Sequence, residues 1–308
     1  MIMKALIVIN PYAGTRRANR YLTDIVEIAN HHGFECTVYT TAASGDGTRL
    51  AREFAPKMDL VIGIGGDGTF NEVVAGVLQS GKTIDVGYIP AGSTNDFANS
   101  LHLSKNIKTA ALDIFEGKTC VLDVGCFRQR YFSYVASFGA FTKASYSAPQ
   151  NIKNGLGHLA YLLEGIKDLS GIHPEHLKIE TPDRTIEGDF LFGAISNSTS
   201  IGGILTLNPS LVSMNDGMLE VMLIKHPADP LELGRIVYSL QSRQYDPAVV
   251  SFFSTKELTV TASPTMNWSL DGEMEPGGKI IKVRNLHHAL RLRVPAKNRT
   301  LADVITEE

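Results

Sequence analysis

The sequence predicts an α/β fold in which a doubly wound, mostly parallel sheet is followed by a domain rich in β-sandwich strands. In the first half, short apolar runs such as 61–64 and 86–90 lack polar alternation, which is typical of strands covered on both faces. In the second half, apolar and polar residues alternate, which indicates antiparallel strands with one buried face. We therefore expect domains at 1–130 and 131–294, with the active site in the cleft between them.

The elements follow from these two patterns in chain order. Apolar residues at helical spacing follow residues 21, 47 and 70, which predicts a helix between each two of the first four strands. Pro or Gly ends most of these apolar runs. The expected strands are 5–9, 36–41, 61–64, 86–90, 130–136, 176–180, 185–192, 219–224, 257–261, 279–283 and 289–294, with helices also at 156–169 and 230–240.

Composition narrows the class of protein. The chain has 308 residues, 44% of them hydrophobic and 20% charged, as in ordinary soluble globular proteins of one or two domains. A formal net charge of −3 gives no global positive field, which argues against a nucleic-acid partner. Three scattered cysteines (Cys36, Cys120, Cys126) suit a reducing cytoplasm, and no apolar run approaches the ~20 residues of a membrane span. We expect a cytoplasmic protein, at most peripheral to a membrane.

The central motif is a glycine-rich turn between a buried strand and a helix. Glycines let a backbone approach phosphate closely, and a helix N-terminus attracts anions. A carboxylate at such a turn would repel phosphate unless a divalent cation lies between them, which suggests Mg²⁺. The alternative is a tight turn whose aspartate caps a helix. The motif consists of Gly65, Gly66, Asp67, Gly68, Thr69, Phe70, Asn71 and Glu72.

Further polar loops follow neighbouring strands. Residues 10–14 and 92–98 each begin where a predicted strand ends, so they should meet the central motif at one sheet edge. Asp67, Asp96 and Asp123 would then form a site for Mg²⁺ and water, unless each is a separate helix cap. A second Gly-Asp-Gly-Thr at 45–48 lacks the preceding strand glycines and is interpreted as a helix cap.

These loops together resemble the diacylglycerol kinase catalytic-domain family, and most closely its soluble bacterial lipid kinases. The resemblance implies a phosphofructokinase/NAD kinase-like first domain, ATP as phosphoryl donor, Mg²⁺, and a C-terminal tail, 295–308, that returns to the first domain. It also suggests a homodimer. Two departures, Ala13 for the usual Ser and Ser93 for the usual Thr, keep small side chains. The implied nucleotide contacts are Asn10, Pro11, Tyr12, Ala13, Gly14, Thr41, the central motif from Gly65 to Glu72, Gly92, Ser93, Thr94 and Asn95.

A turn in the second half carries a different implication. Asn215-Asp216-Gly217 alone indicates a hairpin turn entering a strand. The resemblance implies a structural Mg²⁺ held there by the Asp216 side chain and by backbone carbonyls, to which Ser213 and Met218 correspond.

Two carboxylates near the C-terminal end are the candidate catalytic groups. Asp271 and Glu273 flank Gly272 and could point to one side of an extended chain; the alternative is an Asp-Gly turn between strands. A lipid kinase needs a base that orients the acceptor hydroxyl. The resemblance places this base here, with Asp271 favoured and Glu273 as its partner or substitute. The histidines, including His176, His287 and His288, show no metal-binding spacing and are interpreted as surface or core residues.

The resulting hypothesis is an ATP- and Mg²⁺-dependent lipid kinase that phosphorylates diacylglycerol or a related lipid. The alternatives are an NAD kinase-like enzyme acting on a soluble hydroxyl and a non-catalytic nucleotide- or lipid-binding module. A lipid kinase would work at a membrane surface, with 138–141 and 201–207 as candidate docking loops, although buried packing explains these stretches equally well.

Overall fold

The computed structural model describes residues 2–14, 18–139, 173–201 and 205–296. The chain divides into two compact units, Met1–Val124 with His287–Glu308 (unit 1) and Gly125–Leu286 (unit 2). The chain passes from one unit to the other after Val124 and after Leu286, earlier than the predicted domain limits at 130 and 294. The reason is that strands β5 and β17 each continue from one unit into the other. The predicted helix at 156–169 and the tail beyond residue 296 lie outside the described residues.

Unit 1 contains a parallel sheet in the order β2, β1, β3, β4, β17, which confirms the predicted parallel architecture. Ile9, Ile64 and Ile89 are partners across this sheet, so the residues after them emerge at the same edge. All of β3 is buried, in agreement with its apolar sequence. The strands are β1 (Met3–Ile9), β2 (Phe34–Thr40), β3 (Leu60–Gly65), β4 (Asp85–Pro90), β5 (Lys118–Phe127) and β17 (Ile280–Val294).

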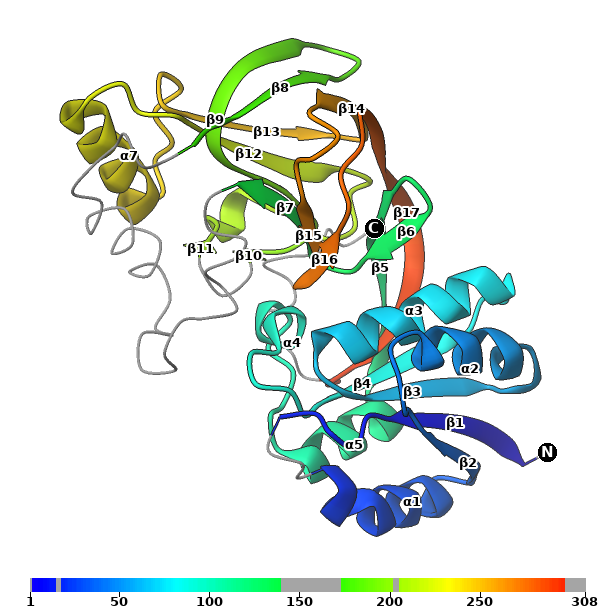
Figure 1. The fold of residues 1–308 in the computed structure, drawn as a ribbon. Coiled ribbons are helices and arrows are strands. Elements are labelled where there is room, and N and C mark those ends of the chain that lie inside the picture. The colour runs from blue at the N-terminus through cyan, green and yellow to red at the C-terminus, as the bar shows by residue number, and fades with distance from the viewer. Residues whose placement is uncertain (1, 15–17, 140–172, 202–204, 297–308) are drawn as a thin grey trace. The chain divides into compact units, whose positions relative to one another are not determined.

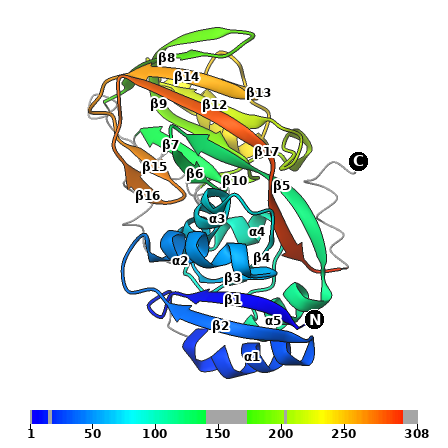
Figure 2. The same cartoon turned by 90° about the vertical axis from the view of Figure 1, so that its right-hand side faces the viewer.

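Helices cover both faces of this sheet (Figures 1 and 2). Helices α2 and α3 lie on one face, and α1 and α5 lie on the other, as in a doubly wound fold. The chain can leave α3 sharply because Gly81 adopts a left-handed backbone with φ of 71°. The helices are α1 (Leu22–His31), α2 (Asp46–Phe54), α3 (Asp67–Ser80), α4 (Asp96–Ser100) and α5 (Ile107–Glu116), with 3₁₀ turns at Ala18–Tyr21 and Ala55–Lys57.

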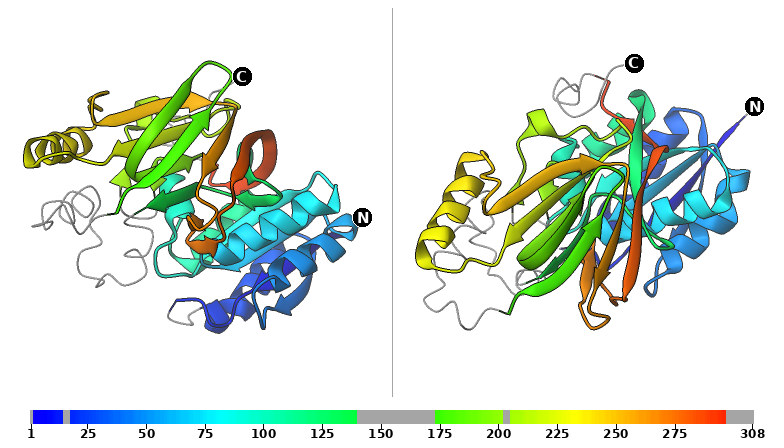
Figure 3. Two further views of the ribbon diagram at one scale, coloured as in Figure 1. Left: turned by 45° about the horizontal axis from the view of Figure 1, so that its top comes forward. Right: turned by 90° about the horizontal axis from the view of Figure 1, so that it is seen from above.

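Unit 2 is built from antiparallel strands in two layers that share strand β9 (Figure 3). The first part of β9 pairs with β8, which pairs with β14, whereas its last part pairs with β7 and β12. Buried aromatic and aliphatic side chains, among them Phe138, Phe190 and Trp268, fill one core. The elements are β6 (Arg130–Phe132), β7 (Val135–Gly139), β8 (Glu175–Glu180), β9 (Thr185–Ser196), β10 (Ser200–Ile201), β11 (Leu205–Thr206), a 3₁₀ turn (Pro209–Leu211), β12 (Leu219–Lys225), α7 (Pro230–Ser242), β13 (Val250–Thr255), β14 (Glu257–Ala262), β15 (Trp268–Leu270) and β16 (Glu273–Glu275).

The last strand differs from the prediction. Two strands, 279–283 and 289–294, were expected, but β17 is one continuous strand over Ile280–Val294. His288 has φ of 55°, and this local bend shifts the alternation of polar and apolar residues. In the sequence, this shift of the alternation resembles the end of one strand and the start of another.

None of the helices in the described part of the chain combines the length and apolar character needed to cross a membrane.

Candidate active site

Three loops of unit 1 meet at the carboxyl ends of β1, β3 and β4. The Asn10 backbone N–H donates to Ile64 O at 2.9 Å, and the Ala91 N–H donates to Gly65 O at 2.7 Å. The Asn10 side-chain amide donates to Thr69 Oγ1 at 3.1 Å. The structure therefore brings together the loops 10–14, 65–69 and 91–95.

The loops can touch backbone to backbone because the residues at the contacts are glycines, which have no side chain. A Cβ atom on Gly92 would lie 2.5 Å from Gly66 Cα, and one on Gly14 would lie 2.4 Å from Ala91 O. Gly14 also has φ of 51°, a left-handed conformation that favours glycine. Any larger residue would push the loops apart. Such bare backbone beside the first turn of α3 suits a phosphate group.

Asp67 links the central motif to the next loop. Its Oδ2 accepts the Asp96 N–H at 2.9 Å, and its Oδ1 accepts the Phe97 N–H at 3.3 Å and lies 3.4 Å from the Tyr88 hydroxyl. Burial raises the pKa of Asp67, while the two backbone N–H groups and Tyr88 oppose that rise. Asp67 thus caps α4, a helix that begins 29 residues further along the chain.

Asn95 shapes the third loop. It adopts φ of 53°, its Oδ1 accepts the Gly92 N–H at 2.9 Å, and its side-chain amide donates to Gly92 O at 2.9 Å. This ring of hydrogen bonds leaves the neighbouring residues Ser93 and Thr94 exposed. Both hydroxyl residues are therefore accessible to a ligand.

The remaining predicted nucleotide contacts differ in accessibility. Phe70 is buried and stacks on Tyr88, with ring centroids 4.3 Å apart, so its side chain belongs to the core. Thr41 is buried beside β1, where its N–H donates to Ile9 O at 2.9 Å. Asn71 is buried; Pro11, Ala13, Gly66 and Gly68 are half-buried; and Tyr12 is 66% exposed.

Glu72 holds the second Gly-Asp-Gly-Thr loop. Its carboxylate accepts the Gly45 N–H at 2.6 Å and the Gly47 N–H at 2.9 Å. The Asp46 carboxylate binds residues that precede it in the chain: its Oδ2 accepts the N–H groups of Ala42 and Ala43 at 2.9 and 3.1 Å. The 45–48 segment begins α2, but the expected side-chain cap is wrong, because Gly45 occupies the cap position and Asp46 binds the preceding loop.

Asp123 has partners that the sequence analysis did not find. Its Oδ1 accepts the His288 backbone N–H at 2.8 Å and lies 3.0 Å from His287 Nδ1. Asp123, His287 and His288 form a group whose possible ligand atoms all lie within 4.8 Å of one another. The adjacent histidines were the available signal, but their partner is more than 160 residues away in sequence. The expected Asp67, Asp96 and Asp123 network stays a prediction.

Asp271 is buried in unit 2 at the turn between β15 and β16. Its carboxylate accepts three backbone N–H groups, from Ser133 at 2.5 Å, Tyr134 at 3.1 Å and Val135 at 2.9 Å. Asp271 and Gly272 have φ of 48° and 89° and form a two-residue turn. The expected extended chain is therefore wrong, and the alternative of an Asp-Gly turn is correct.

Glu273 lies on the other side of this turn and is paired with an arginine. Arg130 Nη2 lies 3.1 Å from Glu273, and Arg130 Nη1 lies 2.6 Å from Glu275. Partial burial disfavours the charge of Arg130, but the two carboxylates raise its pKa overall. Glu273 and Asp271 therefore make separate contacts.

The predicted structural metal loop contains a compact turn. Asp216 Oδ1 accepts the Met218 N–H at 2.9 Å, and Met218 O accepts the Asn285 side-chain amide at 2.7 Å. Ser213 Oγ lies 3.2 Å from Asn215 Oδ1. Oxygen atoms of the type that Mg²⁺ prefers are present in this segment, and the ligand set stays a prediction.

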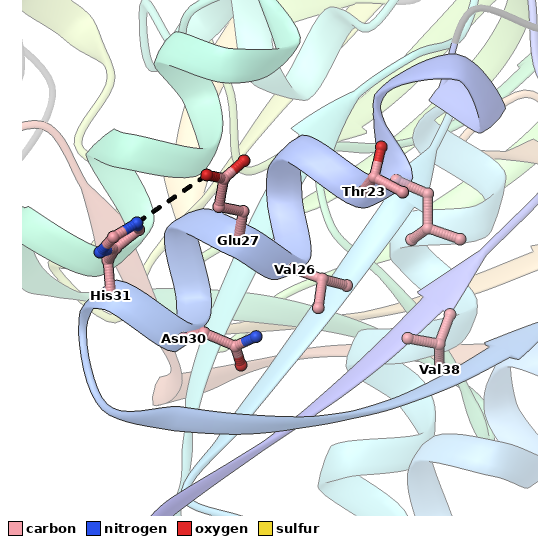
Figure 4. A pocket seen from close by; sticks show the side chains of 7 residues that line it. Thr23, Val26, Glu27, Asn30, His31 and Val38 are labelled. Atoms are coloured by element: carbon pink, nitrogen blue, oxygen red, sulfur yellow. Dashed lines mark ion pairs between the residues drawn. The ribbon is translucent and has the colours of Figure 1, made fainter.

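Two apolar hollows lie away from the predicted site residues. One, of about 570 Å³, lies between α1 and β2 in unit 1; its lining residues include Val26 and Val38, and Glu27, which also lines it, lies 3.9 Å from His31 (Figure 4). The other, of about 720 Å³, lies against α7 and includes Leu231 and Tyr238.

The candidate docking loops are largely core in the described residues. Phe138, Ile201, Leu205 and Leu207 are each at most 1% exposed. Buried packing is therefore the correct interpretation for these four side chains, and residues 140–141 and 202–204 lie outside the described part.

Comparison with known proteins defines the class. Residues 4–127 match the family described as "Diacylglycerol kinase catalytic domain" and residues 135–292 match "YegS C-terminal NAD kinase beta sandwich-like domain". The two matches, one to each domain, agree with the parallel α/β unit and the β-sandwich of the structure. Together with the curated relatives they identify the chain as a kinase with two domains. The chain belongs to the diacylglycerol kinase family.

Curated relatives carry the same family name. A diacylglycerol kinase of Bacillus subtilis is 32% identical over 290 residues, covering 92% of this chain and 95% of the relative. One of Staphylococcus epidermidis is 32% identical over 313 residues, covering 100% and 95%. A crystal structure of a diacylglycerol kinase from Bacillus anthracis is 21% identical with a TM-score of 0.73, covering 96% and 98%, and is similar in fold.

Proposed function

We propose that this protein is an ATP- and Mg²⁺-dependent lipid kinase that transfers the γ-phosphoryl group to the hydroxyl of diacylglycerol or a related lipid. The observation that carries the proposal is the direct backbone contact of the loops 10–14, 65–69 and 91–95 at one sheet edge. Curated relatives named diacylglycerol kinase support the lipid as substrate class.

In this proposal, unit 1 binds the nucleotide. The N–H groups of the glycine loops would hold the phosphates, and Thr41 with Ser93 or Thr94 would contact the rest of the nucleotide. Asp67, Asp96 and Asp123 would hold Mg²⁺ through water, and the ion would neutralise charge on the phosphates. Carboxylate oxygens are ligands that fit Mg²⁺. Burial raises the pKa of half-buried Asp67 because it destabilises the charged carboxylate, and a nearby cation would stabilise that charge.

Asp271 would act on the lipid. The acceptor hydroxyl oxygen forms a bond to the γ-phosphorus while the bond to the bridging β–γ oxygen breaks, and the hydroxyl proton passes to a carboxylate. Three N–H donors fix the position of the Asp271 carboxylate. Since phosphoryl transfer depends mostly on positioning, a fixed anion that orients the hydroxyl is sufficient.

A direct assay tests this proposal. Purified protein is incubated with γ-labelled ATP and Mg²⁺ together with micelles of diacylglycerol, phosphatidylglycerol or a sphingoid base, and separately with NAD. We expect label in a lipid and loss of labelling when Mg²⁺ is chelated. Label in NAD would favour the NAD kinase-like alternative, and nucleotide binding without transfer to any acceptor would favour a non-catalytic module.

A further inference from the structure

The hydroxyl of Tyr88 lies between two of the loops that meet at the candidate active site. Tyr88 is near the end of β4 and is 2% exposed, so its side chain belongs to the interior of unit 1. Its hydroxyl lies 3.4 Å from Asp67 Oδ1 and 3.4 Å from Asn95 Oδ1. One phenol group therefore bridges the first turn of α3 and the loop 91–95, although Tyr88 is not among the predicted nucleotide contacts.

Aromatic packing fixes the position of this hydroxyl. The Tyr88 ring stacks on Phe70 with centroids 4.3 Å apart and an interplanar angle of 21°, and Phe70 stacks on Phe97 with centroids 4.9 Å apart. Both phenylalanines are 1% exposed. Phe70 lies in the first turn of α3 with Asp67, and Phe97 lies in the first turn of α4, directly after the 91–95 loop. A buried and stacked ring has little rotational freedom, so the hydroxyl is held at one place between the two loops.

The chemistry of the two acceptors decides where the hydroxyl donates. A phenol has one proton, so Tyr88 can donate to only one acceptor at a time. Hydrogen bonds to an ionised carboxylate are stronger than those to a neutral amide oxygen. Asn95 Oδ1 also accepts the Gly92 N–H at 2.9 Å and therefore keeps a donor when the phenol proton lies elsewhere. The Tyr88 hydroxyl accordingly donates to Asp67, at the same Oδ1 that accepts the Phe97 N–H.

We propose that Tyr88 is a positioning residue, which holds the Asp67 carboxylate in the orientation that binds hydrated Mg²⁺ beside the nucleotide phosphates. This role rests on the proposed function, in which Asp67 holds Mg²⁺ through water. Tyr88 and the Phe97 N–H hold Oδ1, and the Asp96 N–H holds Oδ2. A carboxylate fixed in this way loses little orientational freedom when it accepts hydrogen bonds from the water ligands of the ion. Tyr88 should therefore affect the part of nucleotide binding that depends on Mg²⁺.

The experiment measures ADP binding to the full-length protein by calorimetry, once with Mg²⁺ and once with a chelator. The ratio of the two affinities reports how much Mg²⁺ contributes to binding, and the wild type should bind ADP more tightly with Mg²⁺. Tyr88→Phe keeps the aromatic stack and removes only the hydroxyl, and it should reduce this ratio about tenfold. A general loosening of the fold would lower both affinities alike and leave the ratio unchanged.

Asp67→Asn tests the route of the effect. This variant should also reduce the ratio, because it replaces the carboxylate that Tyr88 positions. If Tyr88 acts through Asp67, adding Tyr88→Phe to Asp67→Asn should cause no further reduction.

Tyr39→Phe is the matched control. Tyr39 of β2 also packs against a phenylalanine of a neighbouring helix, Phe54 of α2, with ring centroids 4.9 Å apart, but it is not one of the proposed nucleotide contacts. It should keep the wild-type ratio, and circular dichroism verifies the fold of every variant.

The outcomes separate the role of Tyr88 from the proposed function. An unchanged ratio in folded Tyr88→Phe overturns the role of Tyr88 and leaves the proposed function intact. So does an equal reduction in Tyr39→Phe, or a further reduction in the double variant. A wild type that binds no ADP, or binds it equally well with and without Mg²⁺, contradicts both.

Discussion

Asp271 and Val135 are hydrogen-bonded in both directions. The Asp271 N–H donates to Val135 O at 2.9 Å, and the Val135 N–H donates to the Asp271 carboxylate at 2.9 Å. The reciprocal pair fixes the turn after β15 to the start of β7, so the candidate catalytic carboxylate is also part of the framework of unit 2.

Asp271→Asn should reduce both catalysis and stability. Asparagine tolerates the left-handed backbone of this turn, but its amide group presents donors to N–H groups that need acceptors. We expect kcat to fall by at least 100-fold and the free energy of unfolding to fall by about 1–3 kcal/mol. Lipid phosphorylation and denaturant unfolding measure these effects. Unchanged kcat in the folded variant would contradict the proposed role.

Glu273→Gln should have a much smaller effect on catalysis. Glu273 is 41% exposed at its side chain and pairs with Arg130, which also pairs with Glu275. Exposed ion pairs contribute only about 0.2–1 kcal/mol, so the variant should lose less than tenfold in kcat. Glu275→Gln is the matched control because it removes the other carboxylate of the same arginine. A loss in Glu273→Gln as large as in Asp271→Asn would make Glu273 the base.

Asp67 should make stability depend on pH. Since burial raises the pKa of Asp67 above its ordinary value of 3.8, the folded protein binds this proton more readily than the unfolded chain. The stabilisation from this group is complete below pH 3.8 and is lost as the pH rises through the raised pKa. Wild-type stability relative to Asp67→Asn should therefore decrease from acidic to neutral pH.

Denaturant unfolding of both proteins at a series of pH values measures this difference. A constant difference between wild type and Asp67→Asn would contradict the expected proton linkage. The same variant should lose at least 100-fold in kcat if the carboxylate positions Mg²⁺ and water.

Glu72→Gln should loosen the loop before α2. The variant keeps one carbonyl acceptor but replaces the other oxygen with an amide donor opposite the N–H groups of Gly45 and Gly47. We expect a loss of about 1–2 kcal/mol in the free energy of unfolding and faster proteolysis near residue 45. Glu53→Gln, at an exposed glutamate of α2, should be neutral. Equal stability of the two variants would show that Glu72 does not hold the loop.

The fold could be predicted where local sequence determines structure. The apolar run at 61–64 becomes the fully buried strand β3, and the glycines after it form the expected turn into α3. The identity of the glycine loops was likewise accessible, because steric demands for glycine are local.

The contacts of the site residues could not be predicted, because they join distant parts of the chain. Asp67 caps α4, which begins 29 residues further along the chain, and Asp271 binds the N–H groups of 133–135, more than 130 residues earlier. The two histidines of β17 likewise meet Asp123 only after the chain has passed through unit 2. Periodicity also failed at His288, where one left-handed residue mimics the end of a strand.

Strand β17 has a consequence for how the protein is made. Its last part adds to the edge of β4, where Arg291 and Leu292 align with Asp85 and Val86. A ribosome must therefore translate all of unit 2 before the first sheet receives its final strand. Until then, β4 exposes an unpaired edge, which is the kind of surface on which nascent chains associate wrongly and chaperones act.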